Sequence, residues 1–221
     1  MERHAQHHGH HTHHGHGTHD HEAGMADLLD LDAEALGPYL DDLTAWVDEH
    51  TDAAPRLIAD VGAGTGTGAM ALARRFPEAD IVAVDRSPVM LDRLRETARE
   101  RGMGGRVRVV EADLDAAWPR VGTVDLAWAA SSLHHVTDPD RLLADLHAAL
   151  RPGGLLVVVE MDAPPRFLPE DLGIGCPGLE ERCHEIGDLG RLLADDGPHA
   201  LTHRGDLAVR GSRTAWAARR V

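Results

Sequence analysis

Apolar and polar positions along the chain predict strands and helices in alternation. Short apolar runs, typical of strands buried in a parallel sheet, are separated by segments with helical spacing. The predicted strands are residues 56–61, 80–85, 106–113, 124–130 and 155–160. The predicted helices are residues 66–76, 87–101 and 138–150. This order predicts an α/β fold with a doubly wound, mostly parallel sheet.

Two further segments flank this core. Leu36, Leu40, Leu43 and Val47 recur at helical spacing, so residues 25–55 are expected to form an N-terminal helical cap. At the other end, residues 207–210 and 214–219 flank Gly211-Ser212, which predicts a C-terminal antiparallel hairpin at one sheet edge. The main domain should therefore span residues 56–221, with residues 161–205, rich in Pro, Gly and acids at their start, as an insert. Residues 152–154, Pro-Gly-Gly, are expected to stop the last helix before the strand at 155–160.

Composition narrows the classes of function. The formal net charge of −15 argues against nucleic acid as a partner, because an acidic surface repels phosphates. No apolar run approaches the roughly 18 residues of a membrane span, and no signal peptide is visible, so a cytoplasmic protein is expected. Cys176 and Cys183 lack the spacing of a zinc knuckle and are expected to be reduced.

Histidine dominates residues 4–21, so residues 1–24 are predicted to be a disordered tail. Neutral imidazole binds divalent transition metals such as zinc, nickel, copper and cobalt. The candidate metal ligands are His7, His8, His10, His11, His13 and His14. Two alternatives remain open: a solvated tail that binds metal adventitiously, and a translation start at Met25.

The segment with most chemical content follows the first predicted strand. Gly62, Gly64 and Gly66 form a turn without Cβ atoms, so a ligand can approach the backbone there. The following helix directs its unpaired N–H groups to the same place, and Asp85 at the end of the next strand can bind a ribose diol. A nucleoside cofactor is indicated, although residues 64–69 also fit a dinucleotide-binding pattern.

Four segments, in order, resemble the motifs of class I S-adenosylmethionine-dependent methyltransferases. They are residues 60–66 (DVGAGTG), 81–91, 109–114 (VVEADL), and 124–136 together with 150–154. The likeness covers residues 55–160 and is greatest to the small-molecule branch that includes quinone-biosynthesis enzymes. It implies a Rossmann-like fold, S-adenosylmethionine as cofactor and a small-molecule methyl acceptor.

The resemblance also implies roles for individual residues. The backbone of Gly62, Ala63, Gly64, Thr65 and Gly66 would contact the methionyl and ribose parts, and Asp60 would hold a glycine N–H or, through water, the cofactor ammonium. Asp85 would accept from both ribose hydroxyls, Asp113 from the adenine amino group, and the Leu114 N–H would donate to the ring. Met90 would pack on adenine and Ser131 would face the methionine end; Arg86 and Ala112 complete the set. Two alternatives stay open, in which Asp113 only caps a loop and Asp85 only caps the next helix.

Methyl transfer is an in-line displacement, so alignment and desolvation supply most of the rate. His134 and His135 are candidate general bases, or they only shape the site. Residues 33–50, 134–137 and 161–187 are expected to form the acceptor pocket. Two rival functions remain: a non-enzymatic metal-binding protein on a methyltransferase scaffold, and an NAD(P)-dependent reductase. The chain contains no lysine, so it cannot have the catalytic Tyr-x-x-x-Lys pair that the reductase hypothesis requires. The acceptor and the oligomeric state are left open by the sequence.

Overall fold

The computed structural model describes residues 24–26, 29, 33, 36–161 and 213–220. The chain divides into two compact units, one made of residues 1–158 and 216–221 and the other of residues 159–215. The sheet and helices described below lie in the first unit, apart from the end of the fifth strand and the start of the sixth.

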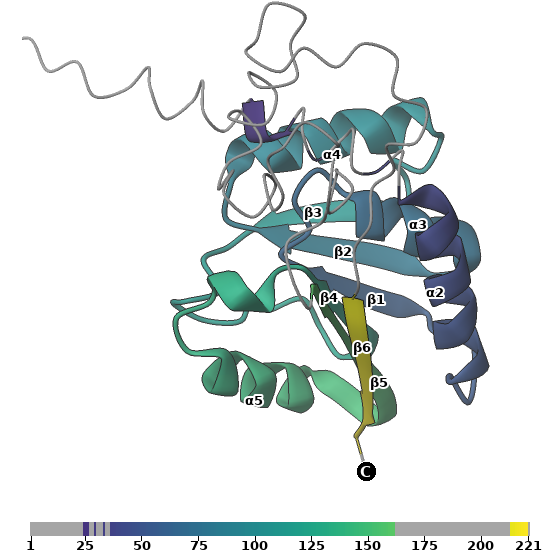
Figure 1. The fold of residues 1–221 in the computed structure, drawn as a ribbon, viewed down its shortest axis with the longest axis vertical. Coiled ribbons are helices and arrows are strands. Elements are labelled where there is room, and N and C mark those ends of the chain that lie inside the picture. The colour runs from purple at the N-terminus through teal and green to yellow at the C-terminus, as the bar shows by residue number, and fades with distance from the viewer. Residues whose placement is uncertain (1–23, 27–28, 30–32, 34–35, 162–212, 221) are drawn as a thin grey trace, which may run out of the picture. The chain divides into compact units, whose positions relative to one another are not determined.

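A six-stranded sheet forms the centre of the first unit, in the order β3-β2-β1-β4-β5-β6 (Figure 1). Its strands are β1 (Leu57–Val61), β2 (Asp80–Asp85), β3 (Val107–Glu111), β4 (Val124–Ala130), β5 (Leu150–Met161) and β6 (Arg213–Arg219). β1 runs parallel to both β2 and β4, and β2 runs parallel to β3. The prediction of a doubly wound, mostly parallel sheet is confirmed.

Helices follow the strands where the sequence predicts them. They are α2 (Gly37–Glu49), α3 (Thr67–Arg75), α4 (Pro88–Glu100), the short 3-10 helix η1 (Leu133–His135) and α5 (Pro139–Ala149). Ser87 caps α4 by accepting from the Met90 N–H, and Asp138 caps α5 by accepting from the Arg141 N–H. Both helices start with proline, whose missing N–H costs nothing in a first turn.

The alternation of side chains along each strand assigns the two faces of the sheet. Ala59 and Val61 of β1 and Ala127 and Ala129 of β4 join a buried cluster that includes two leucines of α5. The intervening residues of β1 and β4 point to the opposite face, where α3 packs (Figure 1). Asp60 is therefore presented to α3, on a face that is otherwise apolar.

The C-terminal part of the sheet differs from the prediction in detail. β5 begins at Leu150 and runs through the Pro-Gly-Gly segment that was expected to precede it. The reason lies at the end of β6: Arg220, the residue after β6, accepts from the Gly153 N–H and donates its own N–H to the Gly154 carbonyl. These reciprocal bonds make β6 antiparallel to β5, which confirms an antiparallel C-terminal element at the sheet edge. The predicted hairpin partner, residues 207–210, lies outside the described residues.

Candidate functional site

The carboxyl ends of the parallel strands gather the predicted binding residues at one edge of the sheet. Asp60 lies one residue before the end of β1, Asp85 ends β2, and Ser131 directly follows β4. Asp113 lies two residues after the end of β3. The structure thus brings together residues that lie up to 71 positions apart in the chain, as the motif order implies. In open α/β sheets this edge is where ligands bind.

The glycine loop between β1 and α3 uses its glycines for two different purposes. Gly62, Gly64 and Gly66 all have positive φ angles, of 70°, 53° and 91°. A Cβ on Gly62 would lie 2.5 Å from the Ser132 Cβ, and one on Gly66 would lie 2.5 Å from the Leu94 Cγ. These two glycines are therefore needed for packing. A Cβ on Gly64 would meet only the Leu29 Cδ1, at 3.5 Å.

Asp85 ties this loop to the second strand. Its Oδ2 accepts from the Gly64 N–H at 2.9 Å, and its Oδ1 accepts from the Ser87 N–H at 2.9 Å. Each oxygen has a second lone pair, so the carboxylate can also accept from a ribose diol. The cap of α4 itself is Ser87, and Asp85 supports that turn. Both functions considered for Asp85 are compatible with this geometry.

Asp60 is the most unusual titratable residue of the site. It is only 3% exposed, and desolvation by burial raises the pKa of its carboxyl to about 7; the nearby negative charge of Asp85 acts in the same direction. The Ala69 N–H, in the first turn of α3, donates to the carboxylate and opposes that rise. The Oδ2 atom has no hydrogen-bond partner among the described residues. A buried carboxylate oxygen without a partner is rare in folded proteins and points to a special role for the residue.

The residues expected near adenine lie on the β2–β3 side. The Ala112 N–H donates to the Asp85 carbonyl at 2.9 Å, and Met90 of α4 is buried. Asp113 is exposed, and its Oδ1 accepts from the Asp115 N–H at 2.9 Å. The loop-capping role considered for Asp113 is thus observed, and a second oxygen remains for a ligand. The Leu114 carbonyl accepts from the Arg141 guanidinium of α5, so the group of Leu114 that can contact adenine is its N–H. Arg86 is exposed.

Ser131 and the two histidines lie on the β4 side. Ser131 has a φ of 52°, the only non-glycine residue in the described part of the chain with a positive φ. Such a conformation costs about 1 kcal/mol or more and is often found at functional sites. The rings of His134 and His135 are 3.9 Å apart in η1, and both side chains are exposed.

Sequence reasoning missed three residues that shape this edge. Ser132 is buried, and its Oγ donates to the Val61 carbonyl at 2.7 Å, directly beside Gly62. Asp115 accepts from the Thr137 N–H at 2.7 Å and joins the loop after β3 to the segment after β4. Leu29 lies over Gly64 from the N-terminal segment. None of these contacts has a local signature, because each depends on residues more than 20 positions away in the chain.

The six proposed metal ligands of the N-terminal tail lie outside the described residues. Within the described ranges, no group of three or more His, Cys, Asp or Glu side chains could hold a metal ion. Across the same part of the chain, no helix is long and apolar enough to span a membrane.

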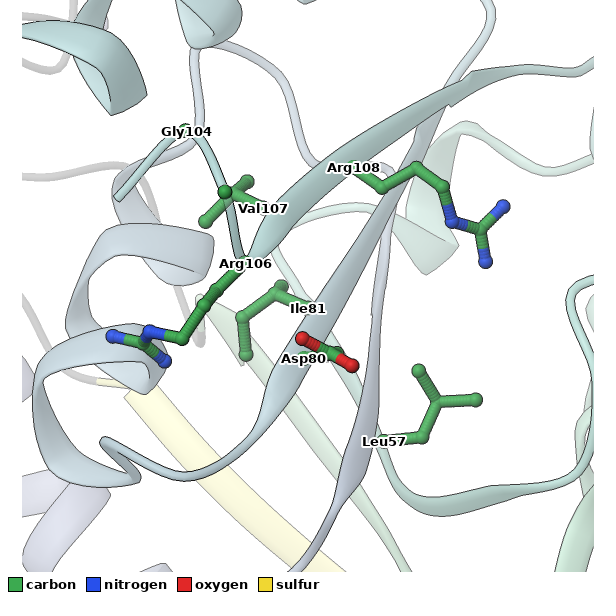
Figure 2. Close-up of a pocket in the computed structure, with 8 residues that line it drawn as sticks. Leu57, Asp80, Ile81, Gly104, Arg106, Val107 and Arg108 are labelled. Atoms are coloured by element: carbon green, nitrogen blue, oxygen red, sulfur yellow. The ribbon is translucent and has the colours of Figure 1, made fainter. Parts of the chain in front are cut away.

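A cavity of about 260 Å³ opens at the opposite edge of the sheet, at the amino ends of β1, β2 and β3 (Figure 2). Leu57, Asp80, Ile81, Gly104, Gly105, Arg106, Val107 and Arg108 line it. The Arg106 guanidinium there donates to the carbonyls of Ala73, Phe76 and Ala79, so it closes the end of α3. None of the predicted cofactor-binding residues lines this cavity, and we assign no ligand to it.

Comparison with known proteins identifies the domain. Residues 58–154 match a family described as a methyltransferase domain. This chain carries a class I methyltransferase domain. The match begins in β1 and ends in β5, so it contains every residue predicted to bind the cofactor.

Relatives and solved structures agree with this assignment. The chain is 38% identical over 120 residues to a demethylmenaquinone methyltransferase of Thermus thermophilus, covering 54% of each protein. It is 36% identical over 159 residues to a trans-aconitate 2-methyltransferase of Methylobacterium radiotolerans, covering 72% of this chain and 51% of the relative. It shares its fold with the plantazolicin methyltransferase BpumL, solved with SAH, at a TM-score of 0.52 and 14% identity over 66% of this chain and 54% of that one. The chain spans about half the length of the curated relatives it matches.

The described residues of the methyltransferase domain fit S-adenosylmethionine. The open backbone at Gly64 and the Asp85 carboxylate beside it offer an acidic, glycine-lined surface, and the Asp60 carboxylate is buried behind it. The cofactor carries a sulfonium and an ammonium, for which carboxylates are suitable neighbours, and a ribose diol that needs acceptors. The reductase and the non-enzymatic scaffold, the two rival functions, find no support in the family match.

Proposed function

We propose that this protein binds S-adenosylmethionine at the carboxyl edge of its sheet and transfers the methyl group to a small-molecule acceptor. The observation that carries the proposal is the pair of carboxylates, Asp60 and Asp85, on either side of a glycine loop with an open backbone. The relatives named as a demethylmenaquinone methyltransferase and a trans-aconitate 2-methyltransferase support a small acceptor. The net charge of −15 supports the exclusion of nucleic acid.

The residues of the chain would bind and orient the cofactor. Asp85 would accept from the ribose hydroxyls, Asp113 from the adenine amino group, and Asp60 would face the ammonium end. Met90, Arg86, Ala112 and Leu114 would line the adenine side, and Gly62 to Gly66 with Ser131 would line the methionine side. When bound, the cofactor supplies a methyl group on a positively charged sulfur, whose departure as a neutral thioether needs no acid. The remaining task of the site is to align the acceptor and exclude water.

The acceptor side is proposed from the sequence. Residues 25–55 would cover the site as a helical cap, and residues 161–205 would contribute the acceptor-side insert. A cytoplasmic location is proposed on the same basis.

The six tail histidines are proposed as ligands of a divalent metal that is separate from methyl transfer. Deletion of residues 1–24 should abolish nickel or zinc uptake in equilibrium dialysis, and unchanged uptake would refute this role.

Isothermal titration calorimetry with S-adenosylhomocysteine tests cofactor binding. The wild-type protein should bind with micromolar affinity, and Asp85→Asn should weaken binding at least tenfold, because the amide presents one acceptor where the carboxylate presents two. Asp92→Ala is the matched control, since Asp92 is an exposed carboxylate on α4 that pairs with Arg95. Absence of heat with the wild-type protein would refute the proposal, and so would equal affinities for all three proteins.

A histidine of η1 is proposed as the proton acceptor when the methyl acceptor must lose a proton. His134→Gln and His135→Gln should each be compared with wild type in a pH–rate profile with labelled cofactor. The base is the histidine whose replacement removes the acidic limb of kcat/KM. Profiles that keep this limb in both variants would assign the pair to shaping of the site.

A further inference from the structure

Asp60 has a neighbour that the sequence motifs do not mention. In the parallel pairing of β1 with β4, Asp60 is the register partner of Trp128. Residues opposite each other in a ladder point to the same face, so both side chains are directed toward α3. Trp128 is fully buried, and Asp60 is 3% exposed. The Asp60 carboxyl and the Trp128 indole are thus buried on the same face of the sheet, behind the glycine loop.

Each of these two side chains carries a polar atom without a partner. The Asp60 Oδ2 has no donor and the Trp128 Nε1 has no acceptor among the described residues. An unsatisfied buried polar group costs about 1–3 kcal/mol, and a charged one costs more. The pair is complementary, because an indole nitrogen only donates and an ionised carboxylate only accepts.

Gly68, in the first turn of α3, lies beside both atoms. The position that a Cβ on Gly68 would occupy is 2.8 Å from the Trp128 Nε1 and 3.2 Å from the Asp60 Oδ2. Both atoms therefore border the same small space, which is free only because residue 68 has no side chain. The helix turn above this space also supplies the Ala69 N–H that donates to the carboxylate.

We propose that Trp128 is a positioning residue for the cofactor: its indole N–H donates to the Asp60 carboxylate beside Gly68, favours the ionised form of that carboxylate and aims it at the cationic methionine end. This inference rests on the proposed function for the cofactor, while the pairing itself can be observed without any ligand. A donor to the charged form favours that form, so Trp128 opposes the effect of burial on Asp60. Its removal should leave Asp60 protonated over a wider pH range.

The other charges around Asp60 are few. Asp85, at the end of β2, disfavours ionisation of Asp60. The basic residues of α3, Arg74 and Arg75, lie in its last turn, far along the helix from Gly68, and Asp125 lies near the opposite end of β4. The first turn of α3 contains no acidic residue. Trp128 and the Ala69 N–H are thus the donors placed to stabilise the Asp60 charge.

The pairing can be tested in the protein without ligand. In 15N–1H spectra, the indole resonance of Trp128 should titrate with a midpoint near pH 7, following the Asp60 proton. It is assigned as the peak missing in Trp128→Phe or, if that variant does not fold, as the peak that persists when Trp46, Trp118 and Trp216 are replaced one at a time. In Asp60→Asn the Trp128 peak should not move between pH 5.5 and 8.5. A Trp128 peak that is equally flat in the wild-type protein would overturn the proposal.

The role in binding has a separate readout. Relative to wild type, Trp128→Phe should bind S-adenosylhomocysteine about tenfold more weakly at pH 6.5, as expected for a shift of about one pKa unit. The ratio of the wild-type affinity to the Trp128→Phe affinity should fall toward one as the pH rises to 8.5, because Asp60 then ionises in both proteins. Titration of the ligand affects both affinities equally and cancels in this ratio. Trp216→Phe is the matched control, since Trp216 is 54% exposed on β6.

The outcomes separate the two proposals. A ratio that stays constant with pH would mean that Trp128 acts only through packing, and the positioning role would be wrong. A titrating indole in a protein that binds no S-adenosylhomocysteine would refute the proposed function and, with it, the positioning role, but would leave the Asp60–Trp128 pair established.

Discussion

Asp60 and Asp125 lie near opposite ends of the parallel strands of the same sheet. They differ in the number of hydrogen-bond donors around the carboxylate and in the direction of the pKa shift. Asp125, near the start of β4, accepts from the backbone N–H groups of Arg56 and Leu57 at 2.8 and 2.9 Å and from the Arg151 guanidinium. Burial disfavours its charge, but these donors outweigh burial and lower its pKa. Asp60 has one backbone donor and a bare oxygen, and burial raises its pKa to about 7.

The difference separates Asp125, a structural carboxylate, from Asp60, a carboxylate of the candidate cofactor site. At the amino edge, the chain satisfies its own polar groups, and Asp125 fastens β1, β4 and β5 together. At the carboxyl edge lie glycines with positive φ, a strained Ser131 and an Asp60 whose Oδ2 has no partner among the described residues. Proteins tolerate such local costs mainly where function needs them. Stability should therefore respond differently to changes at the two edges.

The largest difference is expected for two glycines with nearly the same φ. Gly62, at the carboxyl edge, has a φ of 70°, and Gly102, in the turn after α4, has a φ of 69°. Gly102→Ala meets no atom within 4 Å and should cost only the left-handed strain, about 1 kcal/mol. Gly62→Ala adds the overlap with Ser132 and should cost about 3–4 kcal/mol in urea unfolding. Equal losses would show that Ser132 moves aside freely.

Asp60 should make the ligand-free protein less stable as the pH rises. The folded carboxyl keeps its proton up to about pH 7, whereas the unfolded one loses it near the ordinary pKa of 3.8. Between these values the folded state binds more protons, so the free energy of unfolding falls with rising pH, by on the order of 3 kcal/mol. Asp60→Asn should flatten this dependence in urea titrations from pH 4 to 8. A wild-type curve that rises over this range would contradict the assignment.

Asp125 should behave in the reverse sense. Because its folded pKa is lowered, its contribution is present above pH 4 and is lost as the pH falls further. Asp125→Ala leaves two backbone N–H groups and Arg151 without their acceptor and should cost about 2 kcal/mol at pH 7. Arg151→Ala, the comparison variant, removes only the half-exposed partner and should cost clearly less. Urea midpoints measure both, and a larger loss for Arg151→Ala would shift the role to that residue.

The smallest effect is expected at Ser131. Its φ of 52° is one that glycine adopts freely, so Ser131→Gly should stabilise the protein by about 0.5 kcal/mol. Ala130→Gly, one residue earlier in β4, should instead destabilise by a similar amount because its backbone is extended. Thermal unfolding can resolve the opposite signs. A loss of stability in Ser131→Gly would mean that the serine side chain contributes more than its backbone costs.

The sequence predicted the sheet and the motif positions well because both depend on local patterns. The strand at Asp80–Asp85 and the one at Val124–Ala130 have the predicted bounds, and Ser87 and Asp138 cap their helices. The start of β5 was wrong because the pairing with β6 extends the strand through Pro152 to Gly154. That pairing joins residues more than 60 positions apart, which periodicity cannot register.

Taken alone, the sequence indicated the family and the α/β order, and it predicted the residues expected to bind the cofactor. The family followed from the resemblance of four segments in order, because the glycine turn alone also fits a dinucleotide site, and each strand and helix followed from neighbouring residues. Only the tertiary structure decided which polar groups are satisfied. Asp60 and Asp125 are the same residue type in adjacent strands, and their pKa values move in opposite directions because different distant segments face them. The partnership of Asp60, Trp128 and Gly68 arises in the same way, from strand register and helix packing.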